Sequence, residues 1–206
     1  MMIAIIDYGM GNLHSVSKAL ERLGHTCIIT SDPEEIERAS GVILPGVGAF
    51  GDAMRELEAR GLVAAIKKAA LGGKPLLGIC LGMQLLFTSS DEHGLHQGLN
   101  LLPGHVVKFT GDYRIPHMGW NWLSFKFPHP LFRGLEEGHV YFVHSFHVKA
   151  ANPEDVIATT DYHQPVTAII NRNQIYGMQF HPEKSGKLGL GLLDRFARIA
   201  NQGVQV

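Results

Sequence analysis

The first 80 residues alternate between short apolar runs and helix-like segments, and this alternation most restricts the possible folds. The expected strands are residues 2–8, 26–30, 42–44 and 75–79, and the expected helices begin at Asn12, Asp32 and Asp52, the last continuing to about Leu71. Apolar strands separated by helices imply a parallel sheet that is covered on both faces. Ligands bind such sheets beyond the carboxyl ends of the strands, so these ends should line one crevice.

The second half of the sequence has strand-like segments separated by Pro, Gly and Asn turns. The expected strands are residues 106–109, 120–125, 139–148, 156–160, 166–170 and 174–180, followed by an amphipathic helix over 188–200. We expect these strands to extend the sheet in antiparallel or mixed pairing. Because no repeat or linker divides the sequence, we expect a single α/β domain over residues 1–206, with a mixed, mostly parallel sheet flanked by helices.

Composition and charge argue against several classes of partner. The 206 residues carry a formal net charge of -1 and no long basic run, so nothing indicates binding to nucleic acid or to an acidic membrane. The apolar start meets Asp7 too early for a signal peptide or a membrane span. Only two cysteines occur, Cys27 and Cys80, and a domain of this size needs no disulfide. We therefore expect a reduced, cytoplasmic protein.

The stretch Gly78-Ile79-Cys80-Leu81-Gly82 predicts a nucleophile elbow. An apolar strand reaches Cys80, and a helix over 81–87 is expected to start directly after it, with small residues at the bend. The amino terminus of that helix favours a thiolate, and the amide of Leu81 can stabilise an oxyanion. The competing interpretation is a buried core cysteine, which is a common position for this residue.

The stretch Gln179-Phe180-His181-Pro182-Glu183 supplies candidates for a base and its orienting acid. A thiol nucleophile needs a base that accepts its proton and returns it to the leaving amine. His181 and Glu183 are two residues apart, and extended backbone would point both to the same side. Alone, such a pair is more typical of a protein surface. Together with Cys80 it predicts a Cys-His-Glu constellation.

These two motifs resemble those of the class I glutamine amidotransferases, whose glutaminase domains use a Cys-His-Glu triad on a mixed sheet. Further stretches resemble the family of glutaminase subunits of imidazole glycerol phosphate synthases, which act in histidine biosynthesis. These stretches are DYGMGN at 7–12, PGVG at 45–48, PHMGWN at 116–121, YFVHS at 141–145 and the extension KSG at 184–186. The resemblance spans nearly the whole chain.

The resemblance implies that Cys80 is the nucleophile, His181 the general base and then acid, and Glu183 the orienting carboxylate. It also implies an oxyanion hole and a glutamine pocket, formed by Val47 or Gly48 with Leu81, and by Gln84, Glu92 and the backbone near Ser145. The chain departs from the family at Phe146-His147, where tyrosines are expected. No cofactor and no metal are implied.

The resemblance further implies a partner subunit. Ammonia in neutral water is mostly ammonium, which is no nucleophile, and this chain has no length for a second active site. In the family, a (β/α)8-barrel cyclase covers the mouth of the glutaminase, forms a heterodimer with it and takes the ammonia through its interior. Asn12, Trp120 and Lys184 lie on stretches that are expected to face the cyclase.

Other interpretations of individual residues are weaker. Gly9-x-Gly11 resembles the start of a dinucleotide fingerprint, but His14 stands where the third glycine belongs. His144 and His147 are three apart in a strand pattern and would face opposite ways, so a metal site is not expected. His117 is expected to pack and form hydrogen bonds.

Three alternative functions stay open at this point. The chain could be the glutaminase of another synthase, such as an anthranilate-type enzyme. It could be a stand-alone cysteine hydrolase of related α/β fold, or a non-catalytic subunit that keeps the fold. A degenerate copy usually loses the cysteine, the histidine or the acid, and all three are present here.

Overall fold

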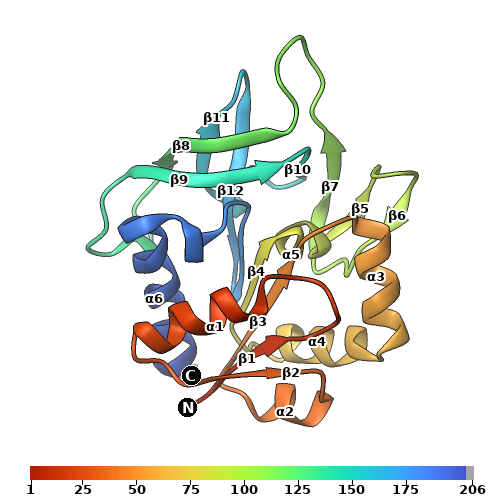
Figure 1. Ribbon diagram of the computed structural model, residues 1–206, viewed down its shortest axis with the longest axis vertical. Helices are drawn as coiled ribbons and strands as arrows, with labels where there is room; N and C mark the ends of the chain where they lie inside the picture. Colours follow the sequence, from red (N-terminus) through yellow and green to blue (C-terminus); the bar gives the residue numbers. More distant parts are fainter. Residues whose placement is uncertain (203–206) are drawn as a thin grey trace.

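The computed structural model describes residues 1–202 and contains the elements labelled in Figure 1. The helices are α1 (Leu13–Arg22), α2 (Pro33–Arg38), α3 (Phe50–Ala59), α4 (Leu62–Leu71), α5 (Leu81–Leu85) and α6 (Gly186–Gln202), and the short 3-10 helices are η1 (Pro130–Phe132), η2 (Pro153–Asp155) and η3 (Pro182–Lys184). The strands are β1 (Ile3–Ile6), β2 (Cys27–Thr30), β3 (Gly41–Gly46), β4 (Leu76–Cys80), β5 (Phe87–Ser90), β6 (His96–Gln97), β7 (Leu102–Lys108), β8 (His117–Phe125), β9 (Gly138–His144), β10 (Phe146–Ala150), β11 (Val156–Asp161), β12 (Pro165–Arg172) and β13 (Ile175–Met178). Within residues 1–202, no helix is both long and apolar enough for a membrane crossing.

One half of the main sheet is parallel, as the alternation of strands and helices predicts. β2, β1, β3, β4 and β13 are neighbours in that order and run parallel. Every residue of β1, β3 and β4 is buried, because helices cover both faces of these strands. α1 and α6 lie on one face and α3 and α4 on the other, with Ile3 and Ile5 in the first core and Ala4 and Ile6 in the second (Figure 1).

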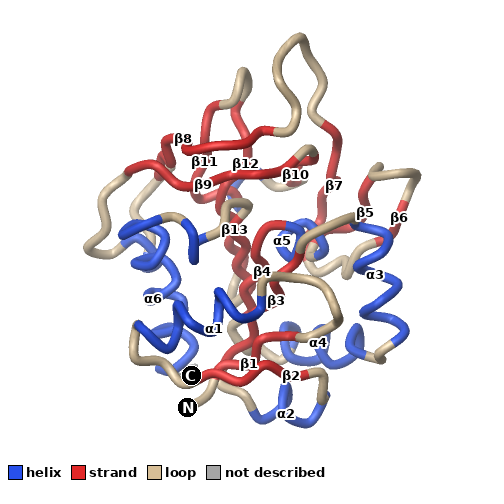
Figure 2. Tube along the Cα trace, in the orientation of Figure 1, coloured by secondary structure: helices blue, strands red, loops and turns tan. Residues whose placement is uncertain are grey.

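The other half of the main sheet is antiparallel, and the strands of both halves are red in Figure 2. β12, β11, β8 and β9 follow β13, which completes a nine-stranded sheet in the order β2-β1-β3-β4-β13-β12-β11-β8-β9. The mixed α/β sheet expected from the sequence is confirmed. Its pairings divide into four parallel and four antiparallel, so the antiparallel share is larger than expected.

A second, four-stranded sheet in the order β10-β7-β5-β6 was not expected from the sequence. The expected strand over 139–148 is in fact two strands, β9 and β10, which separate at a bend at Ser145 and join different sheets. The Phe109 amide donates to the Ser145 carbonyl over 3.0 Å, and β10 pairs with β7 from Phe146 onward. This long-range pairing, rather than a local turn signal, ends β9.

Two expected helices also have different ends. The helix expected over 52–71 is broken into α3 and α4, because Gly61 adopts a left-handed conformation with φ +68°. The helix expected over 81–87 ends at Leu85, and Phe87 already belongs to β5. Neither change affects the strand ends that form the crevice.

The turn between β4 and α5 lies directly against β3, which only glycine permits. A Cβ atom at Gly82 would lie 1.8 Å from the carbonyl oxygen of Leu44, and one at Gly78 would lie 2.5 Å from the carbonyl oxygen of Gly82. Both contacts are with backbone atoms, which cannot move aside as a flexible side chain can. The small residues of the predicted elbow are therefore required by backbone packing.

Replacing Gly82 by alanine is expected to destabilise the protein by about 3 kcal/mol or more, because overpacking against backbone forces β3 and α5 apart. The measurement is the free energy of unfolding from urea denaturation. Gly138→Ala is the matched control, because a Cβ there meets only Leu188 Cδ2 at 3.4 Å. The control should change stability by less than about 1 kcal/mol. Equal stability of the two variants would contradict this packing.

Candidate active site

Cys80 ends β4 and immediately precedes α5, with its backbone at φ +54° and ψ -113°. This is left-handed φ at a residue with a side chain, and such strain persists only where the surrounding structure holds it. β3 and β13 flank β4 on both sides, and α5 packs on the turn. The side chain is only 7 % exposed, yet it reaches the wall of a cavity. The expected elbow is present.

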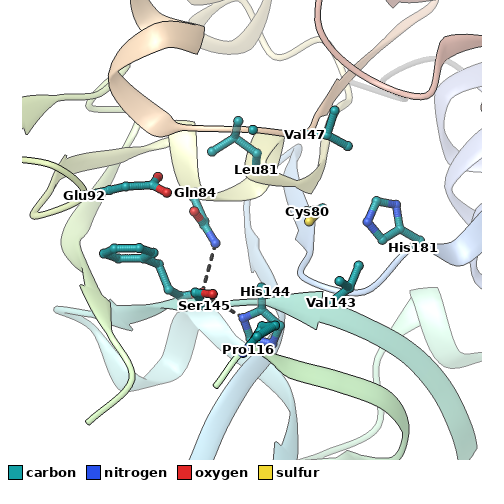
Figure 3. Close-up of a pocket in the computed structure, with 12 residues that line it drawn as sticks. Val47, Cys80, Leu81, Gln84, Glu92, Pro116, Val143, His144, Ser145 and His181 are labelled. Atoms are coloured by element: carbon teal, nitrogen blue, oxygen red, sulfur yellow. Dashed lines mark hydrogen bonds between the residues drawn. The ribbon is translucent and has the colours of Figure 1, made fainter. Parts of the chain in front are cut away.

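A cavity of about 420 Å³ opens beside the Cys80 sulfur (Figure 3). Eight of the nine catalytic and substrate-binding residues expected from the sequence line it, from five separated parts of the chain. These residues are Val47, Gly48, Cys80, Leu81, Gln84, Glu92, Ser145 and His181. The residues at and after the ends of β3 and β4 therefore meet at one crevice, as expected for this type of sheet. The segment after β1, residues 7–9, does not line it, although the sequence predicted that it would.

Strand register brings the backbone of residues 47–48 to the sulfur. Gly46 of β3 is the register partner of Cys80, so Val47 and Gly48 continue past Cys80. Gly48 has φ +96°, and Val47 is 44 % exposed and lines the cavity. The backbone amides of Val47 and Gly48 lie on one side of the turn between β4 and α5, and the Leu81 amide lies on the other. These amides are the candidate donors near the Cys80 sulfur.

His181 lines the cavity, and Glu183 lies behind it. His181 Nδ1 is 3.0 Å from Glu183 Oε1, and the Glu183 side chain is 1 % exposed. His181 has extended backbone, as the sequence suggested, but Glu183 does not. His181 caps η3 and Glu183 lies within this 3-10 turn, which curls the carboxylate back under the imidazole. The Ser185 hydroxyl donates to the His181 carbonyl over 2.6 Å and fixes the turn.

Two buried polar residues near the sulfur were missed by the sequence analysis. The Gln179 side chain donates from Nε2 to Cys80 Sγ over 3.8 Å and accepts from Gln84 Nε2 over 3.1 Å. The Tyr8 hydroxyl donates to the Pro45 carbonyl over 2.8 Å, at the end of β3. Gln179 stands two residues before His181, so the period of a strand could have placed both on one side. Tyr8 follows β1 at the same edge of the sheet.

Glu92 has a structural contact besides its position in the cavity wall. Its Oε2 accepts a hydrogen bond from the Phe50 amide over 2.8 Å. Phe50 is the first residue of α3, and the cap residue Ala49 has no side-chain acceptor of its own. Glu92 therefore caps α3 from a distant loop, and it ties the cavity wall to the segment that carries Val47 and Gly48.

The family model of class I glutamine amidotransferases matches residues 4–198. The chain belongs to this family. It is 55 % identical over 205 residues to the imidazole glycerol phosphate synthase subunit HisH of Geobacillus kaustophilus, covering 97 % of each chain. It is 53 % identical over 211 residues to the protein of the same name from Halalkalibacterium halodurans, covering 99 % of each. The resemblance, the fold class and the class of enzyme expected from the sequence are confirmed.

A solved structure supports the amidotransferase fold independently of sequence. The chain superposes on a crystal structure of a glutamine amidotransferase with a TM-score of 0.76 at 19 % identity, covering 96 % of this chain and 98 % of the other. At this identity the likeness concerns the fold alone. The arrangement of strands around the cavity is thus the common architecture of amidotransferases rather than a peculiarity of this sequence.

The residues expected to face a partner lie outside the amidotransferase cavity. Trp120 is 54 % exposed and lies on the outer face of β8, in line with the exposed Met118 and Trp122. Lys184 is exposed at the end of η3, next to Glu183. Asn12 is half-buried and is the N-cap residue of α1, where the sequence predicted the helix to begin, but its side chain makes no capping hydrogen bond. Among residues 1–202, no group of three or more His, Cys, Asp or Glu side chains is arranged to hold a metal ion.

The protonation of His181 is set by opposing effects. Burial lowers the pKa of His181, but hydrogen bonds and charge interactions with Cys80 and Glu183 outweigh burial and raise the pKa to about 10. The imidazole is therefore cationic at neutral pH. A cationic imidazole beside a thiol is the setting in which proteins hold a reactive thiolate. Burial, together with the charge of Cys80, also raises the pKa of Tyr8, which keeps its hydroxyl protonated as a donor.

Replacing Cys80 by alanine should lower the pKa of His181, because the contact with the sulfur is one of the two that raise it. A histidine whose pKa is raised in the folded state stabilises fully below its ordinary value of 6.5, and this contribution is lost as the pH rises toward 10. The measurement is an NMR titration of the His181 ring in the wild type and in Cys80→Ala. Identical titration curves would contradict the proximity of sulfur and imidazole.

Removing the Glu92 carboxylate should destabilise α3. Glu92→Ala is expected to lower the free energy of unfolding by about 1 kcal/mol, the usual cost of losing a helix cap. Glu92→Gln keeps an acceptor oxygen for the Phe50 amide, and it should recover most of this loss. Chemical denaturation of the three proteins measures the effect. A Glu92→Ala protein as stable as the wild type would show that the cap contributes nothing.

Proposed function

We propose that this amidotransferase hydrolyses glutamine to glutamate and ammonia, and passes the ammonia to a cyclase that makes imidazole glycerol phosphate in histidine biosynthesis. One observation carries the chemical part of the proposal. Cys80 and His181 line the same cavity, and the His181 ring is 3.0 Å from the Glu183 carboxylate. The pathway and the partner rest on the relatives named imidazole glycerol phosphate synthase subunit HisH, which match nearly the whole chain.

The first chemical step is acyl transfer to the sulfur. The Cys80 thiolate attacks the side-chain carbonyl of glutamine, and a carbon–sulfur bond forms while the carbonyl oxygen becomes an oxyanion. His181, cationic because of Cys80 and Glu183, donates its proton to the departing nitrogen as the carbon–nitrogen bond breaks. The products of this step are ammonia and a γ-glutamyl thioester.

The second step returns the enzyme to its starting state. Neutral His181 accepts a proton from a water molecule, which attacks the thioester carbonyl and releases glutamate and the thiolate. Glu183 keeps the His181 ring oriented through both steps, and its burial prevents water from replacing this hydrogen bond. The cycle consumes one water molecule and needs no metal or cofactor.

Backbone amides on both sides of the elbow are suited to hold the oxyanion. The Leu81 amide begins α5, and the amides of Val47 and Gly48 follow the register partner of Cys80. One such donor contributes on the order of 3 kcal/mol to stabilising the transition state. Gln84, Glu92 and the backbone at Ser145 form the remaining wall, where the polar groups of the amino-acid part of glutamine would bind.

A partner subunit is proposed to cover the cavity mouth. The outer face of β8 presents Met118, Trp120 and Trp122, an apolar stripe that is unusual at an exposed position. Exposed aromatic residues of this kind anchor protein interfaces. We propose that the stripe, with Lys184 and Asn12, binds a (β/α)8-barrel cyclase, which forms a heterodimer with this chain and takes ammonia through the barrel.

We further propose that residues 1–206 act as one glutaminase domain in the cytoplasm, where a catalytic thiol stays reduced.

The decisive experiment is a glutaminase assay of the purified chain, alone and with the cyclase subunit and its nucleotide ligand. We expect weak hydrolysis alone and a strong rise with the partner. Cys80→Ala should lose essentially all activity in both conditions, because Cys80 is the one cysteine among the described residues that lines the cavity. A diazo-ketone analogue of glutamine should label the wild type at Cys80. Full activity of Cys80→Ala would overturn the assignment.

The partner assignment has its own control. Trp120→Ala is expected to weaken binding of the cyclase by about tenfold or more, since truncating a buried interface aromatic typically costs 1–2 kcal/mol or more. Phe127→Ala, which removes an aromatic that is 41 % exposed but lies off the stripe, should leave the affinity unchanged. Equal glutaminase rates with and without the cyclase would argue for a stand-alone hydrolase instead.

A further inference from the structure

Two buried histidines form a hydrogen-bonded relay that ends at the cavity wall. His117 Nδ1 lies 2.9 Å from His144 Nε2, and His144 Nδ1 lies 2.7 Å from the carbonyl oxygen of Phe146. His144 lines the cavity, whereas His117 lies behind it on β8 and is fully buried. Figure 3 shows His144 below the cavity, close to Ser145 and Pro116.

The proton positions in this relay follow from the acceptor at its end. A carbonyl oxygen can only accept, so His144 must carry its proton on Nδ1 and leave Nε2 bare. His117 must then donate from Nδ1. Burial lowers the pKa of His144 to about 3 and also lowers the pKa of His117, so both rings are neutral and each holds a single tautomer. His117 Nε2 consequently has no proton and no partner among the described residues.

The relay continues from the Phe146 carbonyl to the sulfur. This carbonyl also accepts from Gln84 Nε2 over 3.1 Å, so a histidine and an amide converge on one oxygen. Gln84 Nε2 donates as well to Gln179 Oε1, and Gln179 Nε2 donates to Cys80 Sγ. An unbroken series of buried and partly buried hydrogen bonds therefore connects His117 on β8 with the nucleophile. Every member has a fixed donor direction.

The surroundings hold His117 in one orientation. Its ring is stacked between Tyr162, with centroids 4.0 Å apart, and Phe142, at 4.7 Å. Stacking on both faces hinders a flip of the ring. The position of its donor atom is therefore set by the backbone of β8. The opposite face of β8 carries Met118 and Trp120, the stripe assigned above to the partner.

We infer that His117 and His144 are positioning residues that hold the Phe146 carbonyl, and through it the amides of Gln84 and Gln179, in place for the reaction at Cys80. This inference rests on the proposed glutaminase function. It extends that function, because neither histidine touches the reacting atoms and His117 does not reach the cavity. A purely packing role for the pair would need only two flat rings and no hydrogen bonds.

Two variants of His117 separate positioning from packing. His117→Phe keeps a flat ring in the stack but has no donor, whereas Asn in His117→Asn places an amide donor near the position of Nδ1. In the complex with the cyclase, His117→Phe should raise the KM for glutamine about tenfold with a smaller change in kcat, as expected for loss of one buried hydrogen bond. His117→Asn should recover most of this loss.

A double-mutant cycle tests the route. If the effect passes through the Phe146 carbonyl to Gln84, His117→Phe should change KM by less than about threefold when Gln84→Ala is already present.

The ¹⁵N shifts of the imidazole rings in the wild type give a readout that needs neither activity nor a variant. We expect a protonated Nδ1 and a bare Nε2 on both His117 and His144.

Four results would overturn the inference. These are a His144 ring protonated on Nε2, kinetics of His117→Phe equal to the wild type, a His117→Asn protein as impaired as His117→Phe, and independent effects of His117→Phe and Gln84→Ala. Thermal unfolding of each variant shows whether that variant folds. If a variant fails to fold, the tautomers of His117 and His144 in the wild type decide whether the inference holds. A wild type without glutaminase activity would remove the proposed function, while the tautomer measurement would still report on the relay.

Discussion

The active site depends on one strained backbone position, Cys80 at the end of β4. Left-handed φ at a residue with a side chain costs of order 1–3 kcal/mol, so the surrounding packing must hold it. The glycines at 78 and 82 provide that packing, because they let α5 rest on the backbone of β3. The same close approach brings the segment after Gly46 alongside the sulfur. The strained backbone of Cys80, the position of its sulfur and the nearby backbone amides therefore all depend on one contact between two strands and a helix.

Register then assembles the rest of the site from distant parts of the chain. β13 runs parallel to β4 with Met178 level with Ile79, so Gln179 arrives level with Cys80 and His181 follows just beyond the strand end. The bend at Ser145 lets β9 stay in the main sheet while β10 leaves for the second one. That bend exposes the Phe146 carbonyl to both Gln84 and His144. The antiparallel half thus supplies the wall that faces the nucleophile.

The sequence predicted the parts of the fold whose cause is local. The strands before and after α1 follow from continuous apolar runs, and the elbow follows from small residues around Cys80. The break at Gly61, the second sheet and the bend at Ser145 were missed, because each is decided by long-range packing or by a glycine whose conformation the sequence does not reveal. The same holds within the site. Cys80, His181 and Glu183 stand in recognisable motifs, whereas the contact of Gln179 with the sulfur and the cap from Glu92 to Phe50 depend on tertiary structure.

Two histidines line one cavity, and their environments drive them to opposite protonation states. His181 lies between a sulfur and a carboxylate, which raise its pKa to about 10, while burial, with smaller effects from neighbouring histidines, lowers the pKa of His144 to about 3. When two similar titratable groups in one site have very different pKa values, they usually have different roles in proton transfer. In the proposed reaction His181 exchanges a proton with the substrate, whereas His144 only orients a carbonyl. A second titrating ring near Cys80 would compete for the proton that the leaving nitrogen needs. Burial is the main cause that keeps His144 neutral, whereas the contacts with Cys80 and Glu183 keep His181 charged against the effect of burial.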